Sequence, residues 1–324
     1  MRAAAYIAGL LGLALLTLLV VHADVPAILG TWKLGGAALL WLVPYRMIYF
    51  VLYAIGWRAM LRPFDPDGRA RFGYVLWVTV VREAVDRLLP VASLGGGVVG
   101  VRLIKWRGLA TVPVSATVIV EVLLTLMAVY LFGALAAMIL LASGTGANHW
   151  HVLAALALSL PIPIGSLLLA RYGSVFQRMQ RFLRPLVGLT GAQAASSLDA
   201  DLRACLGRVR TLLMAGALEF VALISGAFEI WWALRLFAHP IGAPAAIMLE
   251  GLTQAVRHLA FIVPAGLGVQ EAALVLFGHT LGISAELALA VSAVKRMREV
   301  LCGLPPLLAW QWLEARRLRA TGAR

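Results

Sequence analysis

The stretch Pro264-Ala265-Gly266-Leu267-Gly268-Val269-Gln270-Glu271 breaks an apolar region of the chain in two. Charged and polar residues gather on both sides of this break, with Glu250, Arg257 and His258 before it and Lys295, Arg296, Arg298 and Glu299 after it. The flanking sequence reads as membrane-embedded helix, in which a charged side chain near the bilayer centre costs roughly 2.5–3.5 kcal/mol. Groups this costly indicate that they pair with one another, line water or hold a charged ligand.

The composition of the whole chain supports the membrane reading. The 324 residues are 62% hydrophobic and 13% charged, and the mean hydropathy is +0.90. A soluble domain usually carries about 25% charged residues. We therefore expect an all-α polytopic membrane protein that forms one integral membrane domain over residues 1–324.

Apolar runs of membrane-spanning length predict about eight transmembrane helices. They lie near residues 4–21, 37–57, 72–90, 112–141, 151–170, 211–236, 244–263 and 285–312. Two shorter apolar pieces, 94–106 and 268–281, each follow a proline–glycine break. Because these pieces are too short to cross a bilayer comfortably, we expect re-entrant helices there.

The positive charge of the chain, +13 in total, is concentrated between certain apolar runs. The basic segments are 58–71, 102–107, 171–210 and the tail after 313. In the remaining connections Lys33 is the only lysine or arginine. Cationic loops of membrane proteins stay on the cytoplasmic side, so both termini are expected there and 171–210 is expected to be a cytoplasmic basic connector. We therefore attribute the positive charge to the orientation of the protein in the membrane and not to nucleic-acid binding.

Two segments of the chain share a common spacing. Pro90 and Pro264 are 174 residues apart, and so are Glu121 and Lys295. The loop charges predict that the first hairpin starts from the cytoplasmic side and the second from the opposite side. This pattern predicts an inverted repeat, with hairpin-containing halves at 58–141 and 244–312 and a site near the bilayer midplane.

Charged residues within the first hairpin are spaced one helical turn apart. Arg82 faces Asp86 and Glu83 faces Arg87, which predicts two crossed ion pairs on one helix. A salt-bridge ladder that fixes two helices is an equally good reading of this pattern.

The second hairpin carries a polar stripe instead of paired charges. Its members recur at helical spacing and are Glu250, Thr253, Gln254, Arg257 and His258. A polar stripe in a membrane helix is expected to face a wet cavity or other polar side chains.

The last predicted span is rich in cations. Over 250–299 the membrane holds four cations (Arg257, Lys295, Arg296, Arg298) against three carboxylates (Glu250, Glu271, Glu299). Either Glu121 balances the surplus, or the site binds an anion such as a lipid phosphate, for which arginine and lysine are the usual ligands. The glycine breaks fit an anion site, since glycine lets backbone N–H groups approach a ligand closely.

Signals for a cofactor or metal are weak. Asp65-Pro66-Asp67-Gly68 has the composition of a turn, and no nucleotide-binding Gly-x4-Gly-Lys-Ser/Thr loop occurs. We therefore expect no metal and no cofactor. The leading hypothesis is a lipid transporter that is not an enzyme. The alternatives are a membrane enzyme acting on a lipid head group with a carboxylate base, and a non-catalytic scaffold for lipid-modifying enzymes.

The spacing of these residues resembles that of a known family. Pro90-x4-Gly95-Gly96, followed by Arg102 and Glu121, and then Pro264-x-Gly266-x-Gly268-x-x-Glu271, followed by Arg296, resemble a flippase-like family related to the transmembrane region of lysylphosphatidylglycerol synthases. The resemblance extends from about Arg58 to Trp312. The sequence departs from the family where an acidic residue often follows the first glycine pair, since Gly97-Val98-Val99 stands there.

The resemblance implies transport of an anionic or polar-headed lipid between the leaflets of a bacterial inner membrane. The chain looks like stand-alone members associated with hopanoid biosynthesis, and without an aminoacyl-transferase domain we expect no lipid aminoacylation. The implied partners are anionic phospholipid or hopanoid, and a second copy or lipid-biosynthesis enzymes. Together, charge pattern and resemblance predict substrate-binding residues Arg257, His258, Glu271, Lys295, Arg296, Arg298, Glu299, Glu121, Glu250 and Arg102, with hairpin breaks at Pro90, Gly95, Gly96, Pro264, Gly266 and Gly268.

Overall fold

A computed structural model describes residues 25–89, 95–142, 192–260 and 263–322, together with Thr17 and Gly165. Within these residues the protein is helical and contains no strand, as the all-α prediction requires. The predicted spans 4–21 and 151–170 fall outside the described residues apart from these two single positions. Pro90 and the first part of the basic connector, 171–191, also lie outside them.

The helices follow one another with short connections. In chain order they are α2 (Val25–Gly35), η1 (Gly36–Trp41), α3 (Leu42–Leu61), η2 (Arg62–Phe64), α4 (Phe72–Leu88), α5 (Gly95–Lys105), α6 (Thr111–Ala142), α10 (Ala192–Leu206), α11 (Val209–Leu236), α12 (Ala243–Leu259), η3 (Pro264–Gly266), α13 (Val269–His279) and α14 (Ala285–Gly322).

Three described helical segments are long and apolar enough to cross a membrane. They are Leu29–Phe64, Thr111–Ala142 and Val209–Leu236. Large apolar side chains remain exposed on their outer faces, including Leu131 and Met138 of α6 and Leu213 of α11. An exposed apolar surface of this kind suits contact with lipid. The total of eight spans and the re-entrant character of the short helices remain predictions.

The described helices form two sets with the same order. In each set a long helix precedes two short ones and another long helix follows, α3-α4-α5-α6 and then α11-α12-α13-α14. The short helices match in length, because α4 and α12 have 17 residues each and α5 and α13 have 11 each. This match favours the predicted repeat, whose inverted orientation in the membrane remains a prediction.

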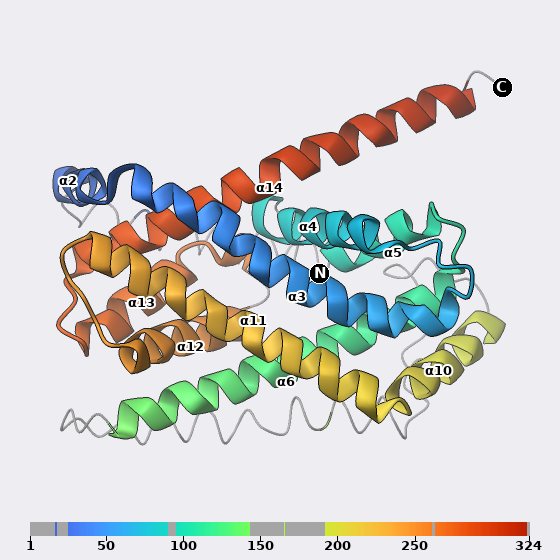
Figure 1. Cartoon of the computed structure of the whole chain (residues 1–324), viewed down its shortest axis with the longest axis horizontal. Coiled ribbons are helices and arrows are strands. Elements are labelled where there is room, and N and C mark those ends of the chain that lie inside the picture. The colour runs from blue at the N-terminus through green and yellow to red at the C-terminus, as the bar shows by residue number, and fades with distance from the viewer. Residues whose placement is uncertain are drawn as a thin grey trace.

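The two sets exchange packing partners across the molecule. Helix α6 packs on α12 of the other set, α14 packs on α4, and α3 packs along α11. In Figure 1 the short pair α4–α5 lies at the upper right and the short pair α12–α13 at the lower left, with the long helices crossing between them. The C-terminal ends of α4 and α12 thereby come together near the centre of the molecule.

A glycine lets α5 fold back tightly against α4. The backbone N–H of Gly96 donates to Asp86 Oδ1 over 2.8 Å. A Cβ atom at Gly96 would overlap the carbonyl oxygen of Arg82 and the carboxylate of Asp86. The first predicted hairpin break therefore has a packing reason at Gly96, while Gly95 begins α5.

The second break has unusual backbone geometry. Ala265, Gly266 and Gly268 have φ angles of 55°, 60° and 75°, in the left-handed region that favours glycine. Ala265 adopts this conformation despite its Cβ, and its carbonyl oxygen accepts hydrogen bonds from Arg257 Nη2 (3.2 Å) and Arg296 Nη1 (2.9 Å). The break between α12 and α13 is therefore held open by two arginines.

Gly96→Ala is expected to destabilise the protein by about 1–3 kcal/mol, because the added methyl group pushes α5 away from α4. The measurement is the midpoint of thermal unfolding in detergent. Gly73→Ala is the matched control, since a Cβ at that helical position meets no atom within 4 Å. Equal melting temperatures for the two variants would contradict the packing role of Gly96.

Candidate functional site

A cavity of about 370 Å³ lies where α3, α4, α6 and the end of α12 meet. It is lined by Tyr49 and Tyr53 of α3, by Thr79, Arg82, Glu83, Asp86 and Arg87 of α4, by Glu121, Val122, Thr125 and Leu126 of α6, and by Arg257, His258, Val263, Ala265 and Gly266. The residues that bring charge to the cavity come mostly from α4. They sit on one side of that helix because they recur at spacings of three and four residues.

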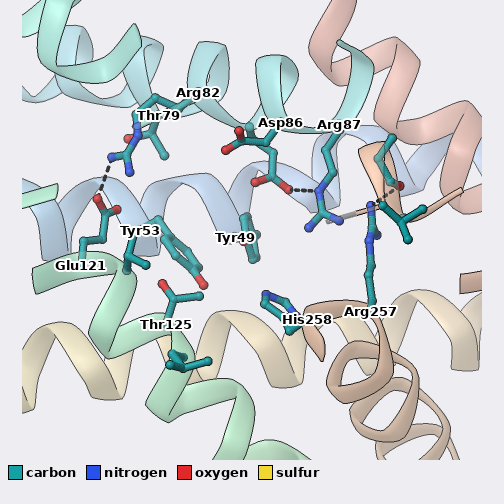
Figure 2. Close-up of a pocket in the computed structure, with 16 residues that line it drawn as sticks. Tyr49, Tyr53, Thr79, Arg82, Asp86, Arg87, Glu121, Thr125, Arg257 and His258 are labelled. Carbon is teal, nitrogen blue, oxygen red and sulfur yellow. Dashed lines mark hydrogen bonds and ion pairs between the residues drawn. The ribbon is translucent and has the colours of Figure 1, made fainter. Parts of the chain in front are cut away.

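Arg87 presents an open cationic group to the cavity. Its Nε donates to Glu83 Oε1 over 2.9 Å, and within the described part of the chain its two terminal nitrogens have no further partner. Figure 2 shows the guanidinium of Arg87 reaching down from α4 toward the ring of His258, which belongs to α12. His258 Nδ1 lies 2.9 Å from the carbonyl oxygen of Gln254, so the other ring nitrogen is available. Two nitrogen-bearing groups thus face the same space from opposite helices.

Two tyrosines form the aromatic wall of the cavity. The ring centroids of Tyr49 and Tyr53 are 4.5 Å apart, and the guanidinium of Arg46 lies 3.6 Å from the centroid of Tyr49. The tyrosines follow each other at i and i+4 on α3, so they share one face of that helix.

The predicted crossed pairs on α4 are half right. Glu83 and Arg87 form the expected ion pair. The predicted pair of Arg82 with Asp86 is wrong, because Arg82 Nη1 contacts Glu121 Oε2 of α6 at 2.7 Å. Asp86 instead accepts the backbone N–H of Gly96, which only the folding of α5 onto α4 brings within reach.

The polar stripe of α12 divides between two environments. Glu250 is buried and pairs with Lys295 of α14, and Gln254 donates to Glu250 over 2.7 Å. Thr253 is buried as well. Only Arg257 and His258, in the last turn of the helix, line the cavity. The stripe thus meets both predicted surroundings, because its first part faces the charged side chain of Lys295 and its last turn faces the cavity.

The surplus cation of 250–299 is balanced by a carboxylate that neither predicted alternative named. Arg298 pairs with Glu229 of α11, a residue outside that stretch, and Arg46 of α3 lies 3.5 Å from the same carboxylate. Glu121, the other predicted partner, is engaged by Arg82. Lys295 and Arg298 are therefore buried and neutralised by protein carboxylates, and neither lines the cavity.

Arg296 contacts the backbone of the second break, and Glu299 pairs with Arg296. Arg296 donates to Ala265 O (2.9 Å) and Gly266 O (3.2 Å) and pairs with Glu271 and Glu299. Glu299 also accepts from Arg257 Nη1 over 3.2 Å. The predicted residues Arg296, Glu299 and Glu271 thus shape the cavity rim through Ala265 and Gly266, which line it, rather than by facing it themselves.

Arg102 lies far from these residues. Its side chain is 59% exposed and pairs with Glu314 near the end of α14. The structure therefore separates it from the other predicted binding residues.

Several residues of the cavity were absent from the predicted site. They are Tyr49, Tyr53, Thr79, Arg82, Glu83, Asp86, Arg87 and Thr125. The available signal was the density of charge on α4, an otherwise apolar helix. The same charges also allowed the interpretation that they form ion pairs between helices. Arg82 of α4 and Glu121 of α6 form such a pair.

One buried carboxylate forms no ion pair with any residue that the structure describes. Glu219 of α11 is 2% exposed, and its Oε2 accepts from Thr125 Oγ1 over 2.8 Å. Thr125 lines the cavity and so links Glu219 to it. Among the described residues, no group of three or more histidine, cysteine or acidic side chains is arranged to hold a metal ion.

Fold and site together define a helical membrane protein with a charged cavity beside the break between α12 and α13. The chain belongs to the family of the lysylphosphatidylglycerol synthase transmembrane region, whose family model matches residues 6–304. The family resemblance drawn from the Pro-Gly motifs is confirmed. No curated protein and no solved structure matches the chain.

Glu250→Gln is expected to cost about 3–5 kcal/mol of stability, because it leaves Lys295 as an uncompensated buried cation. Glu219→Gln is expected to cost far less, since among the described residues its side-chain partner is the uncharged hydroxyl of Thr125. The free energy of unfolding in denaturant, measured for both variants at the same pH, compares them. A larger loss for Glu219→Gln would overturn this assignment of pairs.

Proposed function

We propose that the protein is a lipid transporter that moves an anionic or polar-headed lipid between membrane leaflets through the cavity. The observation that supports this most is the open guanidinium of Arg87 in a cavity of about 370 Å³. Family membership supports a membrane protein with a lipid-related function. Translocation itself is our proposal.

The rim of the cavity suits a lipid. Val122 and Leu126 of α6 and Val263 of the break add apolar surface, and Val122 is 43% exposed. A head group enters beside this rim while its acyl chains remain in the surrounding bilayer. The chains then need no enclosed path, and only the head group has to be shielded from hydrocarbon.

The charged groups of the cavity suit a phosphate. The two terminal nitrogens of Arg87 form a planar fork that matches two phosphate oxygens. His258, across the cavity, supplies a further nitrogen. The cations Lys295 and Arg298 play a structural part in this proposal, because buried carboxylates already hold them.

The proposal includes the membrane and the partners. We place the protein in a bacterial inner membrane with both termini cytoplasmic, and we regard an anionic phospholipid or a hopanoid as the lipid. A second copy of the chain or lipid-biosynthesis enzymes are its proposed protein partners. Without a nucleotide-binding loop in the sequence, transport would be proton-coupled or passive.

Arg87→Gln is expected to slow leaflet exchange by about tenfold or more, since it removes a charge-assisted contact worth about 1.5–3 kcal/mol. The assay uses purified protein in liposomes that carry a labelled phospholipid, with gel filtration to check the fold. Arg102→Gln is the matched control, because it makes the same substitution at a surface position away from the cavity.

Three outcomes of this assay separate the hypotheses. Exchange that survives Arg87→Gln in a folded protein would refute the proposed site. A change in the mass of the lipid, detected after incubation with the wild-type protein, would point to an enzyme. If the wild-type protein neither moves nor alters any lipid tested, the hypothesis of a non-catalytic scaffold is favoured.

A further inference from the structure

A second cavity, of about 490 Å³, lies at the end of α3 and shares no residue with the first. Its lining includes Arg58 and Arg62, the apolar residues Ile55 and Ala59, and Phe72 at the start of α4. The connection between α3 and α4, which carries Asp65 and Gly68, closes its other side. Nothing in the proposed transport uses this cavity.

Arg58, near the end of α3, and Arg62, the first residue of η2, lie about one helical turn apart. Ile55, Arg58, Ala59 and Arg62 follow at i, i+3, i+4 and i+7, while Ala54 and Trp57 point into the core. The face therefore changes from apolar to basic along the helix. Like charges four residues apart repel each other, so an anion between them would relieve that repulsion.

The one carboxylate in this cavity is already occupied. Asp65 Oδ1 accepts the backbone N–H of Arg69 and Oδ2 that of Ala70, each over 2.8 Å. Within the described part of the chain, no ion pair or side-chain hydrogen bond engages Arg58 or Arg62, whereas Arg69 on the same connection pairs with Asp67. The cavity thus contains two exposed arginines that form no ion pair within the described part of the chain, beside Asp65, which keeps its own negative charge.

The position of the cavity near the end of a candidate membrane span favours a lipid anion. The candidate membrane span that contains α3 ends at Phe64. Arg58 and Arg62 lie within about two turns of that end, and the ends of membrane spans are expected near the lipid head groups. Ile55, 39% exposed, lies one turn further from that end.

We infer that this cavity binds the phosphate head group of an anionic phospholipid, with Arg58 and Arg62 as its ligands and Ile55 beside the first part of an acyl chain. Basic segments next to a membrane span attract anionic lipid in general. A formed cavity with two unpaired arginines adds a defined site to that general attraction. The inference concerns binding and is independent of the proposed transport.

The test measures phosphatidylglycerol binding to purified protein in an uncharged detergent, by native mass spectrometry and by the rise in melting temperature. Arg58→Gln/Arg62→Gln is expected to weaken binding about tenfold or more, because each arginine contributes a charge-assisted hydrogen bond. Arg69→Gln/Arg71→Gln is the matched control, since it removes two charges from the same connection but outside the cavity. The control is expected to bind as the wild type does.

Further arms of the experiment distinguish the source of the phosphate. Phosphatidylcholine and inorganic phosphate at the same concentration are expected to give little or no shift. An equal shift with inorganic phosphate would assign the site to a soluble anion, and an equal shift with phosphatidylcholine would exclude recognition of charge. Equal losses in the two double variants would reduce the effect to general electrostatics. If the double variant does not fold, Arg58→Gln and Arg62→Gln are each expected to show a partial loss, and two wild-type affinities would overturn the inference.

Discussion

The structure depends on the need of each charge in an apolar interior to find a partner. Leaving one buried charge uncompensated costs several kcal/mol, so partners are recruited from whichever helix lies near. Glu229 of α11 lies within reach of both Arg46 of α3 and Arg298 of α14. Lys295 of α14 reaches Glu250 of α12. The pair of Arg46 with Glu229 joins α3 of the first set to α11 of the second, and the other two pairs fix α14 to its neighbours within the second set.

The cavity occurs where this pairing is incomplete. Arg87 donates its Nε–H to Glu83, and its two terminal nitrogens face the cavity. Glu219 has a hydroxyl in place of a cation. The break at Ala265 and Gly266 adds backbone to the same space because Arg257 and Arg296 hold its carbonyl groups. A polar space thus persists inside an apolar protein, next to an apolar rim that suits lipid.

Local spacing predicted what lies within one helix. The pair Glu83–Arg87 and the glycine break at Gly266 and Gly268 were predictable, because i,i+4 geometry and left-handed φ angles depend only on neighbouring residues. The pair Arg82–Asp86 satisfied the same rule but did not form. Arg82 found Glu121 on α6, and Asp86 found an N–H of α5. Spacing within one helix makes a pair possible, and packing between helices decides whether a better partner exists.

The sequence by itself determined that this is a helical membrane protein and which family it belongs to. It also indicated a short helix after each proline–glycine break, and charges inside the membrane that need partners. Composition and local periodicity carry that information. Only the tertiary structure decided which charges are compensated and which remain open. Glu229 lies too far from Arg298 along the chain for any spacing rule to join them. The candidate site therefore centres on Arg87 rather than on the cations of the last helix, because Lys295 and Arg298 already pair with carboxylates that lie near them in space.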